Sequence, residues 1–383
     1  MVSDLIVVGE RRPYAPSATY QLMSRLTLDR KVLWVDADAF GRARNLAPET
    51  PAVAVAEGRA PEDTKAPFPV LAAEDLGAGN HPLARLVSSR LLVRRVMRAA
   101  QQRRLRDPIL WLASPWATAL IEAGYKGRVV YQVGRQPPTL DAETARVLSA
   151  REAAIIARAD VVLLPGRQAL PQARRVRTRL LPTAVDLDLF CTPAQRARDL
   201  PGQGPIAGCH GHLDQGFDVQ LLAGVARRLH AWRFMLLGPV SCDLGPLHGL
   251  ANVSIAGARP HDQLPRYLQF WDASLLLRRP GAPAERAPAA PLLEALATGL
   301  PVVVAGACNL GGYADLVNRV DGVDGAVNAL LAAAAGLGEG RVLRRRRVAG
   351  DGWGARAAMV NRLLAEFDED AAMVQLTGAP VCR

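Results

Sequence analysis

Residues 278–306, RRPGAPAERAPAAPLLEALATGLPVVVAG, combine features that suit binding of a phosphate or a sugar hydroxyl. A loop rich in Pro, Ala and Gly leads into a short helix that carries Glu294; Gly299 fits the C-cap of that helix, and Pro301 begins the next strand. A carboxylate early in such a helix can accept hydrogen bonds from vicinal hydroxyls, as on a ribose, while the helix amides receive a phosphate. The same carboxylate can instead serve only to stabilise the helix dipole.

A second candidate for anion binding is the segment GCHGHLDQGFD at residues 208–218. The pattern predicts a strand, a glycine turn and a helix that begins near Gln215 or Gly216. Free amides at that helix N-terminus, together with Gly211, would offer an anion site. Gly211 can equally serve only the turn.

Polar residues also follow two predicted strands. His210 and His212 lie at a strand end, where one of them can hydrogen-bond a substrate, although a lone histidine is more often structural. The first loop, Gly9–Pro16, is not a G-x-G-x-x-G fingerprint, which argues against an ordinary nicotinamide or flavin site. Arg11 and Arg12 in this loop can bind an anion, or their side chains can simply be solvated.

Two tandem α/β domains must position these residues, because short apolar β-branched runs alternate with amphipathic helical segments along most of the chain. Strands apolar on both faces indicate parallel sheets covered by helices, here doubly wound and Rossmann-like. The pattern restarts after the Pro- and Gly-rich segment 191–205. The predicted parts are an N-terminal domain, a C-terminal domain and a C-terminal helix with its tail, at residues 1–195, 203–352 and 353–383. We expect a deep cleft between the domains.

Composition narrows the class of protein. The 383 residues are 50% hydrophobic and 22% charged, which fits a globular chain with large cores. The net charge of +11 comes mostly from arginine and favours a polyanionic partner. Five scattered cysteines without a C-x-x-C pair indicate neither a zinc site nor a disulfide framework. Asp4 stands where a secretory signal carries basic charge, so we expect a cytoplasmic protein.

Five segments form an ordered set of motifs over most of the chain, and each motif is weak alone. The motifs, in order, are REAAIIARADVVLLP (151–165), LPTAVDLDLF (181–190), FMLLGPV (234–240), NVSIAGARPHDQLPRYLQFWDASLLL (252–277) and PLLEALATGLPVVV (291–304). Their order resembles the GT-B glycosyltransferases, and within them the nucleotide-sugar enzymes of family 4. The resemblance makes residues 1–195 the acceptor-side domain and residues 203–352 the nucleotide-sugar domain.

The resemblance implies a donor site for a nucleotide-diphosphate sugar. It places the ribose at Glu294, with Leu293 beside it, the diphosphate at Gly211, at His212 and at the helix that follows, and the base near Ala258 and Arg259. It also implies hexosyl transfer with retention at the anomeric carbon. No metal and no cofactor beyond the co-substrate are required, because helix dipoles and basic side chains offset the diphosphate charge.

The chain departs from the family mainly where basic residues are expected. Asp214-Gln215-Gly216 stands in place of a basic residue, Pro291 in place of a lysine, and Arg286 in place of the upstream glutamate. Two accounts fit. Arg278, Arg279 or Arg286 replaces the missing cations and acts catalytically on the diphosphate. Alternatively, the site is degenerate and the protein is a non-catalytic partner. We favour the enzyme, because the arginines remain clustered with Glu294.

The acceptor is suggested by the segment 85–106, a long basic helix with Val87, Leu91, Leu92 and Val96 on an apolar face. Such a helix can lie on an anionic membrane or can pack on the sheet with a solvated face. We therefore expect a lipid-linked or polysaccharide acceptor, with peripheral contact at the inner membrane face. DNA or RNA is the rival acceptor, although the chain offers few aromatic residues for stacking on bases.

Overall fold

The computed structural model describes residues 2–9, 17–37, 67–71, 84–134, 142–166, 177–282, 290–336 and 339–377. They form two compact units, each built around one parallel sheet. The first unit comprises described residues up to 182 and from 354 onwards, and the second comprises those from 183 to 353. The two doubly wound α/β sheets predicted from the sequence are confirmed.

The sheet of the first unit has seven parallel strands in the order β3-β2-β1-β4-β5-β6-β7. Every residue of β1, β2, β4, β5 and β6 is buried, which explains their continuous β-branched and aromatic composition. The strands are β1 (Leu5–Gly9), β2 (Val32–Asp36), β3 (Val70–Leu71), β4 (Ile109–Leu112), β5 (Val129–Gln132), β6 (Val161–Leu164) and β7 (Thr178–Leu180).

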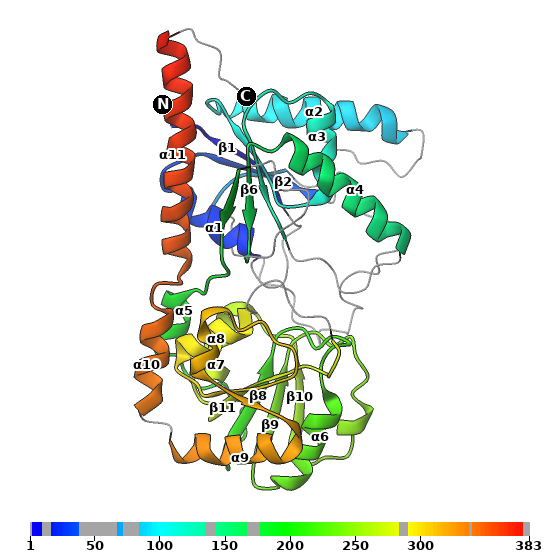
Figure 1. Cartoon of the computed structure of the whole chain (residues 1–383), viewed down its shortest axis with the longest axis vertical. Helices are drawn as coiled ribbons and strands as arrows, with labels where there is room; N and C mark the ends of the chain where they lie inside the picture. The colour runs from blue at the N-terminus through cyan, green and yellow to red at the C-terminus, as the bar shows by residue number, and fades with distance from the viewer. Residues whose placement is uncertain are drawn as a thin grey trace. The chain divides into compact units, whose positions relative to one another are not determined.

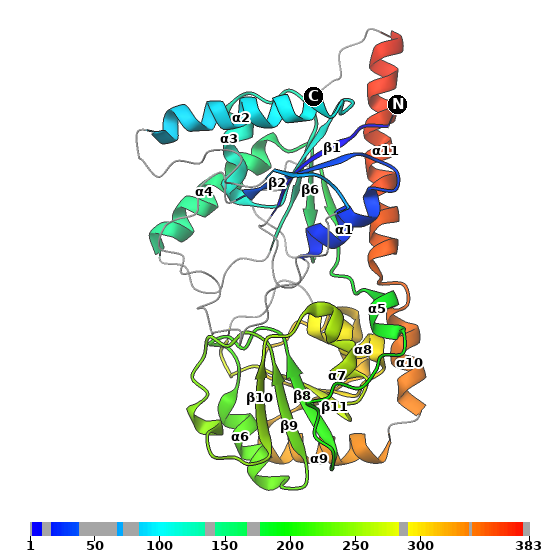
Figure 2. The ribbon, with the colours of Figure 1, turned by 180° about the vertical axis from the view of Figure 1, so that it is seen from behind.

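Helices cover both faces of this sheet. In both ribbon views α2, α3 and α4 lie on one side, and α1 and α11 lie on the other (Figures 1 and 2). The long helix α11 is joined to the unit by an ion pair of 2.8 Å between Arg30 Nη2 and Asp368 Oδ2. The helices are α1 (Ala18–Leu26), α2 (Ala84–Gln102), α3 (Thr118–Glu122), α4 (Ala142–Arg158) and α11 (Trp353–Thr377), with a 3-10 turn at Pro115–Ala117.

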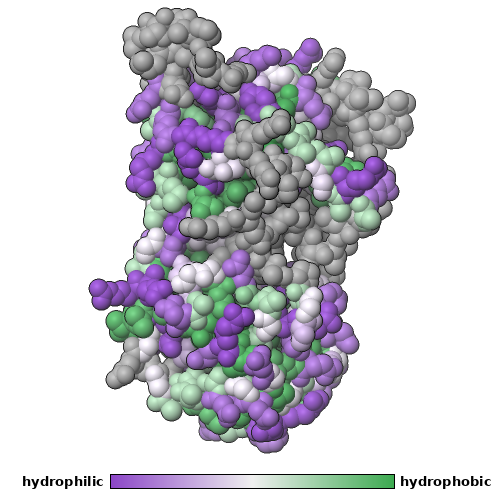
Figure 3. Space-filling model, viewed as in Figure 1, coloured by the Kyte–Doolittle hydropathy of each residue, from purple (hydrophilic) through white to green (hydrophobic). Residues whose placement is uncertain are grey.

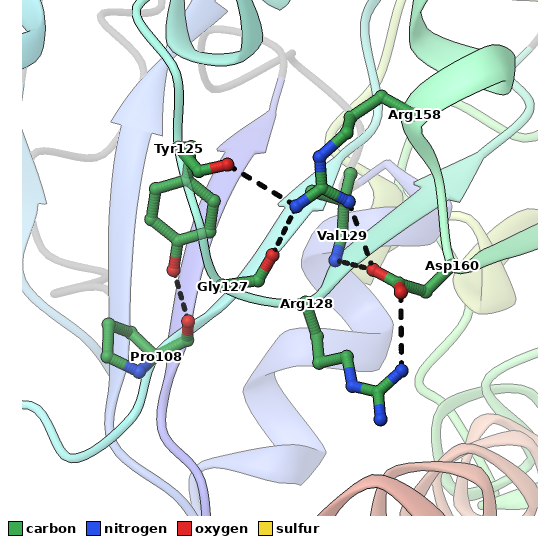
Figure 4. Close-up of polar contacts among 7 residues, drawn as sticks. All are labelled: Pro108, Tyr125, Gly127, Arg128, Val129, Arg158 and Asp160. Atoms are coloured by element: carbon green, nitrogen blue, oxygen red, sulfur yellow. Dashed lines mark hydrogen bonds and ion pairs between the residues drawn. The ribbon is translucent and has the colours of Figure 1, made fainter. Parts of the chain in front are cut away.

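A polar cluster joins the amino ends of β5 and β6. Asp160 Oδ2 accepts a hydrogen bond of 2.8 Å from Val129 N, and the carboxylate lies between Arg128 and Arg158, 3.3 Å from each guanidinium (Figure 4). Arg158 also donates to the carbonyl oxygen of Gly127 at 2.6 Å. The cluster lies at the edge of the sheet opposite the carboxyl ends of the strands, so its role is to hold strands together.

The sheet of the second unit has six parallel strands in the order β10-β9-β8-β11-β12-β13. The direction of the strand order changes between β8 and β11, which lie side by side although 62 or more residues separate them in the chain. The strands are β8 (Ile206–His210), β9 (Arg233–Leu237), β10 (Val253–Gly257), β11 (Ala273–Leu277), β12 (Val302–Ala305) and β13 (Val317–Val320).

Two hydrophobic layers cover this second sheet. One contains α6 and α9, and the other contains α5, α7, α8 and the C-terminal end of α10. The helices are α5 (Leu187–Cys191), α6 (Val219–Arg228), α7 (Pro265–Leu268), α8 (Ala290–Thr298), α9 (Gly322–Ala335) and α10 (Glu339–Val348), with 3-10 turns at Gly245–Leu247, His261–Gln263 and Gly311–Leu316. The 3-10 turn at His261–Gln263 leads directly into the short α7.

The surface in Figure 3 mixes hydrophilic and hydrophobic residues over both units, in keeping with a mean hydropathy of +0.06. Among the described residues, no single helix is long and apolar enough to cross a membrane. One bent pair, Gly322–Ala335 with Gly340–Val348, meets the criteria of length and composition only.

Candidate functional site

The candidate site lies where the strand order of the second sheet reverses. In open α/β sheets, ligands bind outside the carboxyl ends of the strands at such a switch point. Here β8 ends at His210 and β11 ends at Leu277. The loop of Gly211 and the side chain of Arg278 therefore come to one edge of the sheet.

Glu294 on α8 is held by two histidines. Its Oε2 lies 2.9 Å from His210 Nε2, at the end of β8, and its Oε1 lies 2.9 Å from His261 Nε2, in the 3-10 turn after β10. The exposed fraction of the three side chains is 9% for Glu294, 1% for His210 and 14% for His261. Since an ionised carboxylate only accepts hydrogen bonds, each imidazole donates through its Nε2.

The two histidines keep Glu294 ionised. Burial raises the pKa of Glu294, but the hydrogen bonds and the charges of His210 and His261 outweigh burial and lower that pKa to about 2. Burial lowers the pKa of His261, but the hydrogen bond to Glu294 and the negative charges of Glu294, Asp186 and Asp262 outweigh burial and raise that pKa. The cluster is therefore a buried carboxylate with a partner that protonates readily.

His210 is fixed by the residues around it. Its ring meets that of Trp271 edge-on, with 6.0 Å between the centroids. Trp271 in turn lies on Gly208, where an added Cβ would come within 2.4 Å of the indole. His210 Nδ1 is buried and has no hydrogen-bond partner among the described residues. Through Nε2, His210 thus holds one oxygen of Glu294 from a rigid position on β8.

Backbone from three elements converges beside this cluster. Gly211 has a φ of +105°, and an added Cβ there would lie 2.9 Å from Pro291 Cγ at the start of α8. Gly238, after β9, has a φ of +147°, and an added Cβ would lie 1.9 Å from Gly211 O. Both positions therefore require glycine, for conformation and for space. The role of Gly211 towards a diphosphate stays a prediction.

The prediction of a helix that begins near Gln215 or Gly216, with free amides at its start, is wrong. Helix α6 begins at Val219, because Asp218 caps it and accepts a hydrogen bond of 2.9 Å from Leu221 N. The amide of Gly216 donates to Asp214 Oδ1 at 2.8 Å. Asp214 therefore accepts an amide that we expected to be free for an anionic ligand, and Asp218 caps the helix that begins after it.

The arginines that follow β11 are held by the loop after β8. Arg278 Nη1 forms an ion pair of 2.8 Å with Asp214 Oδ1, and the two side chains are 17% and 5% exposed. The guanidinium of Arg278 covers Gly216, where an added Cβ would lie 2.4 Å from Nη2. Arg279 donates to the carbonyl oxygen of Gln215. Arg286 lies outside the described residues.

The side chain of Arg259, which is predicted near the base, is held by Asp199 and Tyr267. Arg259 Nη2 pairs with Asp199 Oδ2 at 3.0 Å, and Arg259 Nε donates to Tyr267 Oη at 3.0 Å. Burial raises the pKa of Asp199, but the hydrogen bonds of Arg259 and Tyr267 outweigh it and lower that pKa. An open depression of about 430 Å³ lies beside this group, lined by Ala197, Arg198, Asp199, Gln263, Arg266 and Tyr267.

The remaining predicted residues differ in how accessible their side chains are. The ring of His212 lies 2.8 Å from Ser241 Oγ through Nε2, at an exposed position. Leu293 is 1% exposed and packs in the core beneath α8, so only its backbone can meet a ligand. Ala258 accepts a hydrogen bond from Arg259 Nη1 through its carbonyl oxygen. Among the described residues, no group of three or more His, Cys, Asp or Glu side chains is arranged to hold a metal ion.

The sequence did not predict two of the polar residues at this site. His261 lies within one of the motifs, but nothing in its local sequence points to Glu294. Asp214 stands where a basic residue is expected, and the sequence does not indicate its pairing with Arg278. The available signal for that pair is that residues of opposite charge follow two of the predicted strands.

Comparison with known proteins identifies the fold. No protein-family model and no curated protein matches the sequence. Solved structures do match. Anabaena HepE, in complex with UDP and glucose, has a TM-score of 0.62 at 14% identity, over 96% of this chain and 99% of that one. The fold is GT-B.

Two trehalose-phosphate synthases have the same GT-B fold. The UDP-forming enzyme of Burkholderia vietnamiensis has a TM-score of 0.62 at 14% identity, over 95% of this chain and 99% of that one. The enzyme of Burkholderia xenovorans, in complex with glucose-6-phosphate, has a TM-score of 0.60 at 13% identity, over 95% of this chain and 100% of that one.

Proposed function

We propose that the protein is a glycosyltransferase that takes a hexosyl group from a nucleotide-diphosphate sugar. The observation that carries this proposal is the ionised Glu294, fixed on α8 beside the Gly211 loop at the switch point of the second sheet. The GT-B neighbours support it, since HepE was solved with UDP and glucose and a trehalose-phosphate synthase with glucose-6-phosphate. All of them are distant in sequence, so the activity rests on the site.

In the proposed donor complex, Glu294 accepts hydrogen bonds from the ribose hydroxyls. The diphosphate lies against the Gly211 loop, with Arg278 and Arg279 as the nearest described arginines and Arg286 as a further candidate. Because the side chain of Arg259 is engaged with Asp199, the base is left to the backbone of Ala258 and Arg259. Transfer breaks the bond between the anomeric carbon and the phosphate oxygen and forms one to an acceptor oxygen, whose proton is released. We propose retention at the anomeric carbon and no metal.

A non-catalytic GT-B partner protein is the second candidate. The observation that favours it is the ion pair between Arg278 and Asp214, which neutralises an arginine that a diphosphate would need. A scaffold with this site would keep the fold and the carboxylate but bind donor weakly or not at all.

For the acceptor we propose a lipid-linked or polysaccharide glycan at the cytoplasmic face of the inner membrane. Helix α2 supplies Arg94, Arg95 and Arg98 on its exposed side, and a cation near an anionic membrane contributes about 1 kcal/mol. Of its predicted apolar face, Leu92 and Val96 are buried against the first sheet, whereas the expectation for Leu91 is wrong because this residue is exposed. Contact with lipid would therefore be mainly electrostatic. Nucleic acid as acceptor would draw on the same charge.

Nucleotide binding separates the two candidates. A panel of UDP, GDP, ADP, CDP and their glucose conjugates should raise the melting temperature of the parent protein for at least one base, because a ligand that binds only the folded state stabilises it. Glu294→Ala should weaken the best ligand by about 1.5 to 3 kcal/mol, or roughly ten- to a hundredfold. If the parent binds no nucleotide, or the variant binds as the parent does, the proposed donor site is wrong and the scaffold stands.

A further inference from the structure

We propose that His261 occupies the ribose subsite and competes with the ribose hydroxyls for Glu294, an inference that rests on the proposed function. In this view the donor pocket is closed by a side chain of the protein itself. Donor binding then requires the His261 ring to leave Glu294 Oε1, which it contacts at 2.9 Å.

Burial makes His261 an obstacle to the ligand. A carboxylate has enough lone pairs for two imidazoles and two hydroxyls, so the number of hydrogen bonds does not exclude a diol. Space does, because the side chain of Glu294 is only 9% exposed with both imidazoles in place. A diol reaches the carboxylate only after one ring moves.

Of the two rings, His261 is the one that can move. His210 is 1% exposed, belongs to the central strand β8 and is covered by Trp271. His261 is 14% exposed and lies in the short 3-10 turn His261–Gln263, with Phe190 edge-on at 5.4 Å between centroids. His210 therefore keeps Oε2 in position while Oε1 is exchanged between His261 and the ligand.

Protonation strengthens the closed arrangement. Among the described residues, the charged groups that act on His261 are three carboxylates: Glu294 on α8, Asp186 at the N-cap of α5, and Asp262 in its own turn. They favour the imidazolium, which forms an ion pair with Glu294, and a charge-assisted hydrogen bond is about twice as strong as a neutral one. Above the raised pKa of His261 the ring is neutral and is displaced more easily. Ribonucleotide affinity should therefore rise with pH.

The test is calorimetric titration of the parent, His261→Ala and His261→Asn at about pH 6 and about pH 8.5, on either side of the histidine range. The ligand is whichever of UDP, GDP, ADP and CDP binds the parent best, and its 2′,3′-dideoxy counterpart is titrated in parallel. His230→Ala is the matched control, because this histidine is exposed on the loop after α6. Circular dichroism checks the folding of each variant.

We expect the parent to gain about tenfold more affinity for the ribonucleotide between the two pH values than either His261 variant gains. The ligand phosphates also titrate between the two pH values. Because this changes the affinity for every protein equally, it cancels when the gain of the parent is divided by the gain of a variant. At the lower pH the His261 variants should bind more tightly than the parent and His230→Ala should match it. The dideoxy ligand, which lacks the competing hydroxyls, should show no difference in pH response among the proteins.

Two failures can be told apart. If no nucleotide binds the parent at either pH, the proposed function fails. If the parent binds but the His261 variants share its pH response, or bind more weakly than the parent at the lower pH, the competition is wrong while the donor site stands. Retained binding by His261→Asn with loss by His261→Ala would likewise contradict competition, because it would make His261 a contact of the ligand.

Discussion

Arg278 and Asp214 form an ion pair of 2.8 Å across the ends of the adjacent strands β11 and β8, where we propose that the donor diphosphate binds. Asp214 also accepts the amide of Gly216 at 2.8 Å, so the same carboxylate shapes the loop and neutralises the arginine. The pair reduces the positive potential available to a phosphate. It therefore bears directly on whether the site works as an enzyme or only as a fold.

Asp214→Asn should release Arg278 without removing the oxygen that accepts the amide of Gly216. Because this pair is mostly buried, removing its negative charge should be worth at least about 1 kcal/mol to a bound phosphate, so we expect at least about fivefold tighter binding of a nucleoside diphosphate, with little change for the nucleoside. Isothermal titration of both ligands measures the difference. The matched control is Asp243→Asn, since Asp243 accepts Gly245 N at 2.8 Å in a similar turn. Equal effects of the two substitutions would show that Arg278 does not meet the diphosphate.

Most of the fold could be predicted because its strands are buried on both faces. Runs such as those of β4 and β12 are apolar throughout, and a strand buried on both faces keeps this pattern whatever the details of packing. The sequence does not predict the edge strand β13, because its four residues VNRV lack an apolar run and are either partly buried or exposed. The start of α6 was misplaced because Asp218, three residues beyond Gln215, provides the cap.

The candidate site was only partly predictable. Glu294 was found from its place at the start of a helix between a loop and a strand. Its partners could not be found in that way, because His261 is 33 residues distant and His210 is 84 residues distant in the chain. Such contacts depend on how β8, the 3-10 turn and α8 pack together, and no local pattern specifies them.

The polar cluster at Asp160 should contribute to stability and not to binding. Asp160→Ala removes the acceptor of the Val129 amide and the ion pairs to Arg128 and Arg158, and we expect a loss of about 2 kcal/mol in the free energy of unfolding. Asp160→Asn keeps an oxygen for Val129 N, and the lost ion pairs are partly exposed, so its cost should be at most about 1 kcal/mol. Urea unfolding measures both. Equal losses for the two variants would mean that the ion pairs outweigh the backbone hydrogen bond.

If α2 contacts the membrane, removing its positive charges should weaken binding to lipid and leave binding of the nucleotide unchanged. Replacing Arg94, Arg95 and Arg98 by glutamate should weaken binding to vesicles that contain anionic lipid by about tenfold or more, and the loss should shrink as salt is added. Nucleotide affinity should not change. A control with the same change of net charge replaces the exposed arginines Arg227, Arg319 and Arg346 by glutamate. If both triple variants lose vesicle binding equally, the net charge and not α2 is responsible. Stronger binding of the parent to DNA or RNA than to vesicles would favour the nucleic-acid acceptor.

The buried Glu294 cluster predicts a distinct dependence of stability on pH. The folded-state pKa of Glu294 is lowered from 4.5 to about 2, so its contribution to stability is present above 4.5 and is lost as the pH falls towards 2. The pKa of His261 is raised from 6.5, so its contribution is present below 6.5 and is lost as the pH rises through the folded-state value. Between 4.5 and 6.5 both contributions are present in full.

Glu294→Gln tests this directly, because it keeps the size of the side chain and removes its charge. Removing one partner of a buried ionic cluster costs about 3 kcal/mol, so the variant should be less stable than the parent by roughly that amount near pH 6. The difference should shrink at both more acidic and more basic pH, which urea unfolding over a pH series measures. Leu293→Ala serves as a control of similar destabilisation, since this buried neighbour carries no charge and its cost should not vary with pH. A difference between Glu294→Gln and the parent that stays constant over the series would mean that the histidines do not form an ionic cluster with Glu294.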